Sequence, residues 1–221
     1  VDKVTGHMNF TATYKATYIE YTVNFYDEDG TLISSETYHY GDEIVVPDHP
    51  SKDADLTYTY TFSGWDSEVG TVTGNMTFTA TYSSEYIEYT VSFYDEDGTL
   101  ISSVTYHYGD EVVLPADPTK ASDEVYGYTF DGWDKDVVVV AGDASYTATY
   151  KATYIEYTVN FYDEDGTLIS SETYHYGDEI VAPNDPSKDA DLTYTYTFDG
   201  WDNEVDKVTG HMNFTATYKA T

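Results

Sequence analysis

The sequence predicts a mainly β chain built from tandem copies of one small domain. Apolar side chains alternate with polar ones in its regular segments, which is the spacing of half-buried strands. No segment shows the 3.6-residue spacing of an amphipathic helix. Aromatic residues make up 17% of the 221 residues, with 26 Tyr among them, and aromatic side chains favour strands. The third observation is internal repetition, which defines the domains.

The repeat has a period of 68 residues. The string Tyr-Ile-Glu-Tyr-Thr-Val begins at Tyr18 and returns at Tyr86 and Tyr154. Residues 1–17 are identical to 205–221, so we interpret them as the C-terminal strand of a preceding repeat in a longer array. The predicted domains are residues 18–85, 86–153 and 154–221. A domain of this size buries only about 60% of its unfolded surface, so an aromatic core must supply most of its stability.

Four strands are expected in each domain, and the first domain shows their pattern. Residues 21–26 alternate apolar and polar side chains, and Asp-Glu-Asp-Gly at 27–30 then predicts a hairpin turn into a second strand over 31–40. Residues 47–55 contain Pro and Asp and predict a connecting loop, with or without one helical turn. Alternation resumes in the last two strands, over 58–62 and 76–82.

The joints between domains shift the alternation by one residue. Phe10, Ala12 and Tyr14 occupy even positions, whereas Tyr21 and Val23 occupy odd ones. A shift of one turns every side chain to the other face, so the chain is expected to leave one sheet and enter another at each joint. The expected joints are residues 15–17, 83–85 and 151–153. They lack Gly and Pro, so we expect a short, stiff connection and an extended rod of domains roughly 26–33 Å long each.

Composition excludes several classes of protein. The formal net charge is -32, from 41 Asp and Glu against nine Lys, and a nucleic acid would be repelled by such a surface. The absence of Cys excludes disulfide scaffolds and thiol catalysis. No apolar run approaches the ~18–20 residues that span a bilayer, so no membrane insertion is expected in this fragment, and no signal peptide begins it.

Five short motifs resemble a known family. They are Tyr-Thr-Val-x-Phe-Tyr-Asp-x-Asp-Gly, Tyr-Gly-Asp-Glu, the Pro-x-Asp-Pro-Thr-Lys of 115–120, the Gly-Tyr-Thr-Phe-Asp-Gly-Trp-Asp of 127–134, and a closing Thr-Ala-Thr-Tyr. Together they resemble the Listeria–Bacteroides repeat, which includes the B-repeat of the internalin surface proteins. The loop before the third strand, at 55–58 and 123–126, looks longer than in the family pattern.

The resemblance implies a fold, a location and a role. The expected fold is mainly β and β-grasp-like: a tandem array of three small mixed-sheet domains arranged as an extended rod. The implied location is extracellular, secreted or at the bacterial cell surface, where such arrays serve as stalks or adhesive segments. The family has no catalytic residues to transfer, and the sequence shows no nucleophile elbow or oxyanion loop, so an enzyme is not expected.

The Asp-Glu-Asp-Gly turns have two open interpretations. Their carboxylates are hard oxygen ligands in a tight turn, which suits Ca²⁺, the one cofactor considered. Asp and Gly also make ordinary hairpin turns, and the further ligands of an EF-hand loop are missing. Calcium could also bind away from these turns, at a seam between domains where several carboxylates meet. The candidate ligands are Asp27, Asp29, Asp95, Asp97, Asp163 and Asp165.

Three further sets of residues recur once per domain. The tryptophans are expected to anchor the cores, with a sugar-stacking platform as the alternative; they are Trp65, Trp133 and Trp201. One lysine per domain could form an isopeptide bond with an aspartate in the presence of a nearby glutamate; these pairs are Lys52 with Asp66, Lys120 with Asp134, and Lys188 with Asp202. One strand histidine per domain is a single ligand that cannot hold zinc without partners; these are His39, His107 and His175.

The leading prediction for function is a semi-rigid stalk or spacer in a large surface protein. Its partners are then the neighbouring repeats of the same protein. A second hypothesis is self-assembly with other copies of the chain, by strand addition through residues 1–17. A third is direct binding of a host protein or a glycan by the repeats.

Overall fold

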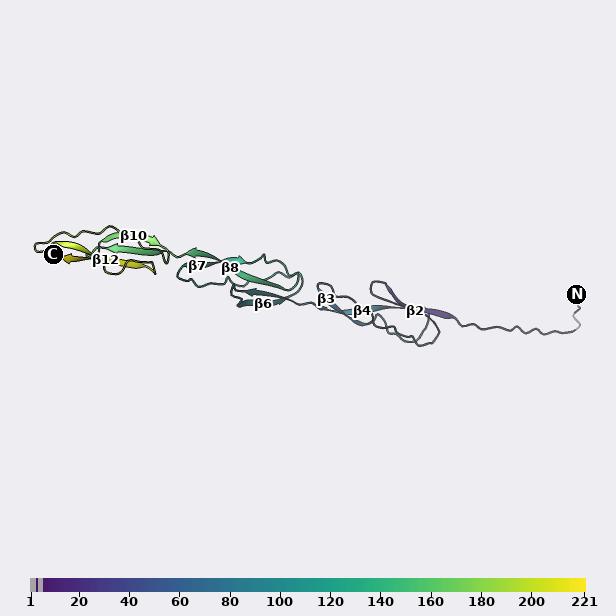
Figure 1. Cartoon of the computed structure of the whole chain (residues 1–221). Coiled ribbons are helices and arrows are strands. Elements are labelled where there is room, and N and C mark those ends of the chain that lie inside the picture. The colour runs from purple at the N-terminus through teal and green to yellow at the C-terminus, as the bar shows by residue number, and fades with distance from the viewer. Residues whose placement is uncertain (1–2, 4–5) are drawn as a thin grey trace. The chain divides into compact units, whose positions relative to one another are not determined.

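Strands account for all the regular structure in residues 3 and 6–221, which are the residues that the computed structural model describes (Figure 1). The first sheet contains β1 (Glu20–Tyr26), β2 (Leu32–His39), β3 (Tyr58–Trp65) and β4 (Met76–Tyr86). The second contains β5 (Tyr89–Tyr94), β6 (Leu100–Tyr106), β7 (Tyr126–Trp133) and β8 (Ala144–Tyr154). The third contains β9 (Tyr157–Tyr162), β10 (Leu168–Tyr174), β11 (Tyr196–Trp201) and β12 (Met212–Ala220).

The three sheets share one mixed topology. The strand order is β2-β1-β4-β3 in the first sheet, and the other two repeat it. The central pair β1 and β4 is parallel, while β2 and β3 run antiparallel to their neighbours at the edges. The prediction of a mainly β tandem array of three mixed sheets is therefore confirmed. By its contacts the chain divides into two compact units, residues up to 89 with 107–109, and residues 90–106 with 110–221.

The last strand of each domain is longer than its apolar alternation. β4 pairs with β1 over Met76–Thr79 and with β3 over Ala80–Tyr86, and β8 repeats this arrangement. The expected joints at 83–85 and 151–153 therefore lie inside strands, and this part of the prediction is wrong. The chain changes sheet at 87–88 and 155–156 instead, because backbone pairing with β3 and β7 continues where the apolar side chains stop.

A small aromatic core lies beside each central strand pair. In the first domain Phe25 stacks on Phe78 at 5.0 Å between ring centres and meets the edge of Trp65 at 4.6 Å. Val23 and Val72 complete the fully buried cluster. The middle domain buries Val91, Phe93, Val140 and Tyr146, and the third buries Val159, Phe161, Val208 and Phe214. Burial of such side chains contributes about 1.5–3 kcal/mol each, which is how a domain without disulfides is stabilised.

The connection between β2 and β3 contains no helical turn. It is tied to the loop before β4 instead: Gly41 N donates to Val72 O at 2.8 Å, and Val72 N donates to Asp42 O at 2.9 Å. Glu43 and Thr71 add an isolated antiparallel bridge. Of the two alternatives for this connection, the structure has the plain loop.

The N-terminal segment differs from its identical copy. Residues 212–220 form β12 between β9 and β11, and Phe214 there is 1% exposed. The same residues at 8–16 form no strand, and Phe10 is 89% exposed. The strand expected within 1–17 is therefore absent from residues 6–17, while residues 1–2 and 4–5 lie outside the described residues. The difference follows from context, because β9 and β11 pair with residues 212–220, whereas the described residues provide no partner strand for residues 8–16.

Candidate functional site

The aspartates of the turn between β1 and β2 stabilise that turn by accepting hydrogen bonds. Asp27 Oδ1 accepts hydrogen bonds from Glu28 N and the Tyr82 hydroxyl, both at 2.8 Å. Asp29 Oδ1 accepts one from Thr31 N at 2.8 Å, and hydrogen bonding to Thr31 lowers the pKa of Asp29. The corresponding contacts occur at Asp95, Asp97, Asp163 and Asp165. These hydrogen bonds use the carboxylate oxygens within the domain, which favours the plain turn. In the part of the chain that the structure describes, no three His, Asp or Glu side chains are grouped to hold a metal ion.

Tyr82 connects the last strand to this turn. Burial, followed by the hydrogen bond that its hydroxyl donates to Asp27, raises the pKa of Tyr82 to about 12. Tyr150 and Tyr218 donate the corresponding bonds in the other domains, at 2.7 and 2.8 Å, and their pKa is also raised to about 12. In each domain a single phenol thus fixes the turn between the first two strands against the last strand.

The lysine of each domain pairs with the turn glutamate. Lys52 Nζ forms an ion pair with Glu28 and lies 3.8 Å from the centre of the Tyr60 ring. Asp66 Oδ1 instead accepts a hydrogen bond from Thr79 N at 3.0 Å. In the other two domains Lys120 and Lys188 likewise pair with a glutamate, and Asp134 and Asp202 accept a hydrogen bond from a backbone amide. The structure therefore brings each lysine to a glutamate and not to the aspartate predicted as its isopeptide partner.

The tryptophans lie at the ends of the third strands, half-buried against the cores. Trp65 meets Phe62 edge-on at 5.4 Å in addition to its contact with Phe25, and Trp133 and Trp201 make the corresponding contacts. This placement suits the predicted core anchors, because each tryptophan packs against two phenylalanine rings.

The joints between domains are built by the loop before the third strand. Asp55 shapes this loop by accepting hydrogen bonds from Thr57 N and Tyr58 N, both at 2.7 Å. Thr57 O then accepts a hydrogen bond from Ile87 N at 2.8 Å, and Leu56 O accepts one from the Tyr89 hydroxyl at 2.9 Å. The second joint repeats these bonds, from Ile155 N to Val125 O and from the Tyr157 hydroxyl to Glu124 O. The loop that looks longer than the family pattern thus contacts the start of the next domain.

Aromatic rings form a row across each joint, which we name the junction row. In the first row, Tyr60 lies 6.3 Å from Tyr58, Tyr58 lies 4.6 Å from Tyr86, and Tyr86 lies 4.5 Å from His107, measured between ring centres. The second row contains Tyr128, Tyr126, Tyr154 and His175, with spacings of 6.3, 4.7 and 4.7 Å. These histidines were expected within strands, but His107 and His175 directly follow the ends of β6 and β10. The row itself was not predicted, because it depends on strand register.

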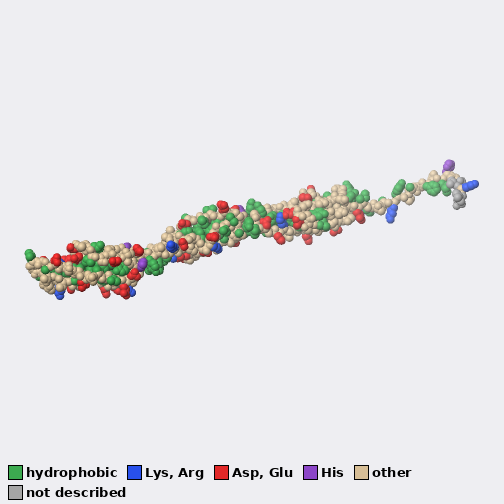
Figure 2. Space-filling model, turned by 90° about the horizontal axis from the view of Figure 1, so that it is seen from above, with side chains coloured by type: hydrophobic (Ala, Val, Ile, Leu, Met, Phe, Trp, Pro, Cys, Tyr) green, Lys and Arg blue, Asp and Glu red, His purple; other side chains and the backbone are tan. Residues whose placement is uncertain are grey.

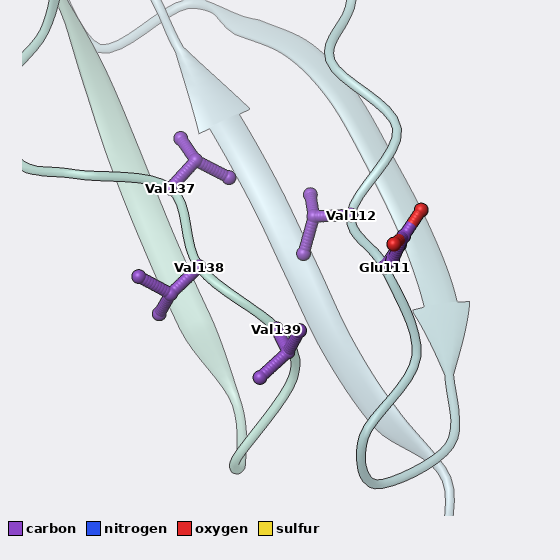
Figure 3. Close-up of a pocket in the computed structure, with 5 residues that line it drawn as sticks. All are labelled: Glu111, Val112, Val137, Val138 and Val139. Atoms are coloured by element: carbon purple, nitrogen blue, oxygen red, sulfur yellow. The ribbon is translucent and has the colours of Figure 1, made fainter.

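The middle domain carries an open hollow lined by valines. Val137, Val138 and Val139 line it from one loop, and Glu111 and Val112 line it from another, around a volume of about 490 Å³ (Figure 3). In the sister domains the positions of Val138 and Val139 hold Gly-Thr and Asp-Lys, and there the loop makes the bridges Glu43–Thr71 and Glu179–Lys207. The valines at 138 and 139 are therefore one of the differences between the middle domain and its sister domains.

Carboxylates are spread over the molecular surface with few lysines between them (Figure 2). The described residues contain no helix long and apolar enough to cross a membrane.

Comparison with known protein families finds the same three tandem repeats. The family model of the Listeria-Bacteroides repeat domain matches residues 21–86, 89–154 and 157–221. A protein of Evansella cellulosilytica named "Putative membrane protein" is 29% identical over 216 residues, covering 89% of this chain and 31% of that protein. A second from this organism, "Putative Gly-rich membrane protein", is 28% identical over 214 residues, covering 90% of this chain and 24% of that protein. The chain thus spans less than a third of these relatives.

Among solved structures, domains 3-4 of the Streptococcal High Identity Repeats in Tandem (SHIRT) from a cell surface protein match 63% of this chain and 100% of that chain. The sequence identity is 16% and the TM-score is 0.35, so this likeness does not establish a common fold. The family matches cover most of the chain and coincide with its three sheets. The chain therefore belongs to the Listeria–Bacteroides repeat family, with three tandem copies of that domain.

Proposed function

We propose that this chain is a semi-rigid spacer segment of an extracellular bacterial surface protein. The observation that carries the proposal is the repetition of the same joint: two hydrogen bonds and a tyrosine–histidine contact accompany each change of sheet. Only two residues, Ile87 and Glu88, separate β4 from β5. A connector this short, held by three contacts, resists rotation far more than a flexible linker does.

The surface charge supports extension of the array. Each repeat is acidic, and like-charged neighbours repel over about 8 Å at physiological ionic strength. This repulsion disfavours arrangements in which the array folds back on itself. Added salt screens the charges and weakens the repulsion. The carboxylates also keep the surface soluble and hydrated, as an exposed spacer requires.

Small-angle scattering on chains of one, two and three repeats tests this function. We expect the maximum dimension to grow in proportion to repeat number, by roughly 26–33 Å for each repeat. A compact arrangement of all 221 residues would instead have a radius of gyration near ~17 Å. A measured value close to that figure at physiological salt would overturn the spacer proposal.

The second candidate function is self-assembly by strand addition through residues 1–17. It is favoured by the exposure of Met8 and Phe10, at 64% and 89%, because the copy of Phe10 at Phe214 is buried. Sedimentation of the chain with and without residues 1–17 tests it, with Phe10→Asp as a point variant. Association that depends on concentration, and that both changes abolish, supports assembly; a monomer at all concentrations refutes it.

A further inference from the structure

The first and second joints each hold one tyrosine pair in close contact. Tyr58 and Tyr86 face each other across β3 and β4 with ring centres 4.6 Å apart, and Tyr126 and Tyr154 do so at 4.7 Å. The other tyrosine–tyrosine ring contacts of the described residues have spacings of 6.3 Å. The two close pairs are therefore distinct among the 26 tyrosines.

The phenol groups of each pair meet at their polar ends. A hydrogen bond to Tyr86 raises the pKa of Tyr58, and one to Tyr154 raises the pKa of Tyr126. The two rings of each pair are inclined by 41° with their centres 4.6 or 4.7 Å apart, and this spacing lets the carbons next to the two hydroxyls approach each other. These are the carbons at which a tyrosyl radical has its unpaired electron density. Tyr86 and Tyr154 are 56% and 57% exposed, so an oxidant in solution reaches them.

We propose that Tyr58 with Tyr86, and Tyr126 with Tyr154, are sites of oxidative dityrosine cross-linking. The oxidant is hydrogen peroxide acting through a haem peroxidase. Each phenol gives up one electron and one proton, the two radicals couple through the ring carbons beside their hydroxyls, and the coupled rings regain aromaticity when those carbons lose their hydrogens to the oxygens. The pair loses two hydrogen atoms in total, and one hydrogen peroxide is reduced to two waters.

The cross-link would reinforce the position where one domain meets the next. It joins residues 28 apart in sequence and ties the start of β3 to the end of β4, beside the bonds that Thr57 and Leu56 make to the following domain. A covalent loop restricts the unfolded chain, as a disulfide does. The chain has no Cys, so this chemistry is a route to covalent reinforcement that does not need a thiol. The inference does not depend on the proposed spacer function.

The experiment oxidises the full chain at low concentration with hydrogen peroxide and a haem peroxidase. We expect monomers that have lost two or four hydrogen atoms and that show dityrosine fluorescence. After digestion, the peptide containing Tyr58 should be linked to the peptide containing Tyr86, and the peptide containing Tyr126 to the peptide containing Tyr154. Tyr86→Phe should remove the first link and leave the second, and Tyr154→Phe should do the reverse. Phenylalanine keeps the ring contact, so both variants should fold, and circular dichroism verifies this.

The chain supplies its own unpaired controls. Tyr18 occupies the position of Tyr86, and among the described residues its ring contacts His39 and no tyrosine. Tyr194 occupies the position of Tyr58, and no ring contact of Tyr194 is found in the same part of the chain. Tyr18→Phe and Tyr194→Phe should leave the monomer cross-link yield unchanged. The proposal is overturned if the Tyr86→Phe/Tyr154→Phe double variant keeps its dityrosine fluorescence as a monomer, or if other tyrosine pairs dominate the linked peptides.

Discussion

At the scale of single residues, each domain depends on a few side chains that connect distant segments. The Tyr82 hydroxyl crosses from β4 to the Asp27 turn, 55 residues earlier in the chain, and Asp55 organises the loop that reaches the next domain. These contacts are polar and lie near the surface. Their value is in positioning, since the buried aromatic cluster supplies most of the stability.

We expect three tyrosines to titrate apart from the rest. The pKa of Tyr82, Tyr150 and Tyr218 is raised to about 12, against about 10 for an ordinary tyrosine. A raised pKa stabilises the fold fully below pH ~10, and that contribution is lost as the pH rises through about 12. Tyrosinate absorbance should show a late step, and Tyr82→Phe should reduce the size of that step. A single step in the folded protein would contradict the prediction.

The third domain should depend on His211 where the first depends on Asn75. Thr158 N donates a hydrogen bond to His211 Nδ1 at 3.0 Å, whereas Thr22 N donates to Asn75 Oδ1 at 2.9 Å. His211→Ala removes the acceptor, so amide exchange of Thr158 should accelerate at constant pH. His211→Asn supplies the acceptor that the first domain uses and should leave the exchange rate slow. Equal exchange rates of Thr158 in the native chain and in His211→Ala would show the bond to be unimportant.

At the scale of strands, alternation predicts where strands exist but not where they end. Ser83, Ser84 and Glu85 are exposed and carry no apolar pattern, yet they are paired in β4 through backbone hydrogen bonds. The junction row was unpredictable for a related reason. A bulge between Phe62 and Gly64 shifts the register by one, so that Tyr86 and not Ile87 faces Tyr58. A register shift depends on backbone conformation, which side-chain alternation does not encode.

The bulge glycine should be sensitive to substitution. Gly64 has φ +133°, a conformation that residues with a side chain rarely adopt. Gly64→Ala should lower the free energy of unfolding by about 1–3 kcal/mol, although a Cβ there has open space around it. Gly74→Ala is the matched control, because Gly74 has open space and no positive φ, and it should change little. Denaturant titration measures both; equal effects would mean that the bulge is not strained.

At the scale of the whole molecule, the composition alone predicts that repulsion between carboxylates is the dominant electrostatic interaction. A net charge of -32 on 221 residues produces repulsion within and between repeats that salt screens. We expect the midpoint of thermal unfolding to rise as sodium chloride is added from low to physiological concentration. Replacing several exposed glutamates by glutamine should flatten this dependence. An unchanged midpoint across that range would show that repulsion is not a significant cost to the fold.

The repeated joint makes a last prediction about the array. Ile87 and Glu88 are the whole connection between β4 and β5, and Ile87 N is bonded back to Thr57 O. Inserting two glycines after Ile87 should leave every domain folded, because the sheets share no strand. The insertion should broaden the distribution of distances between spin labels placed in the first and second domains. The same insertion after Asp53, in an exposed loop, should leave that distribution narrow. If the native chain already gives a distribution as broad as the Ile87 insertion, the joint is a hinge and the repeats are a flexible chain, because contacts at 2.8 Å can restrain motion only when they persist.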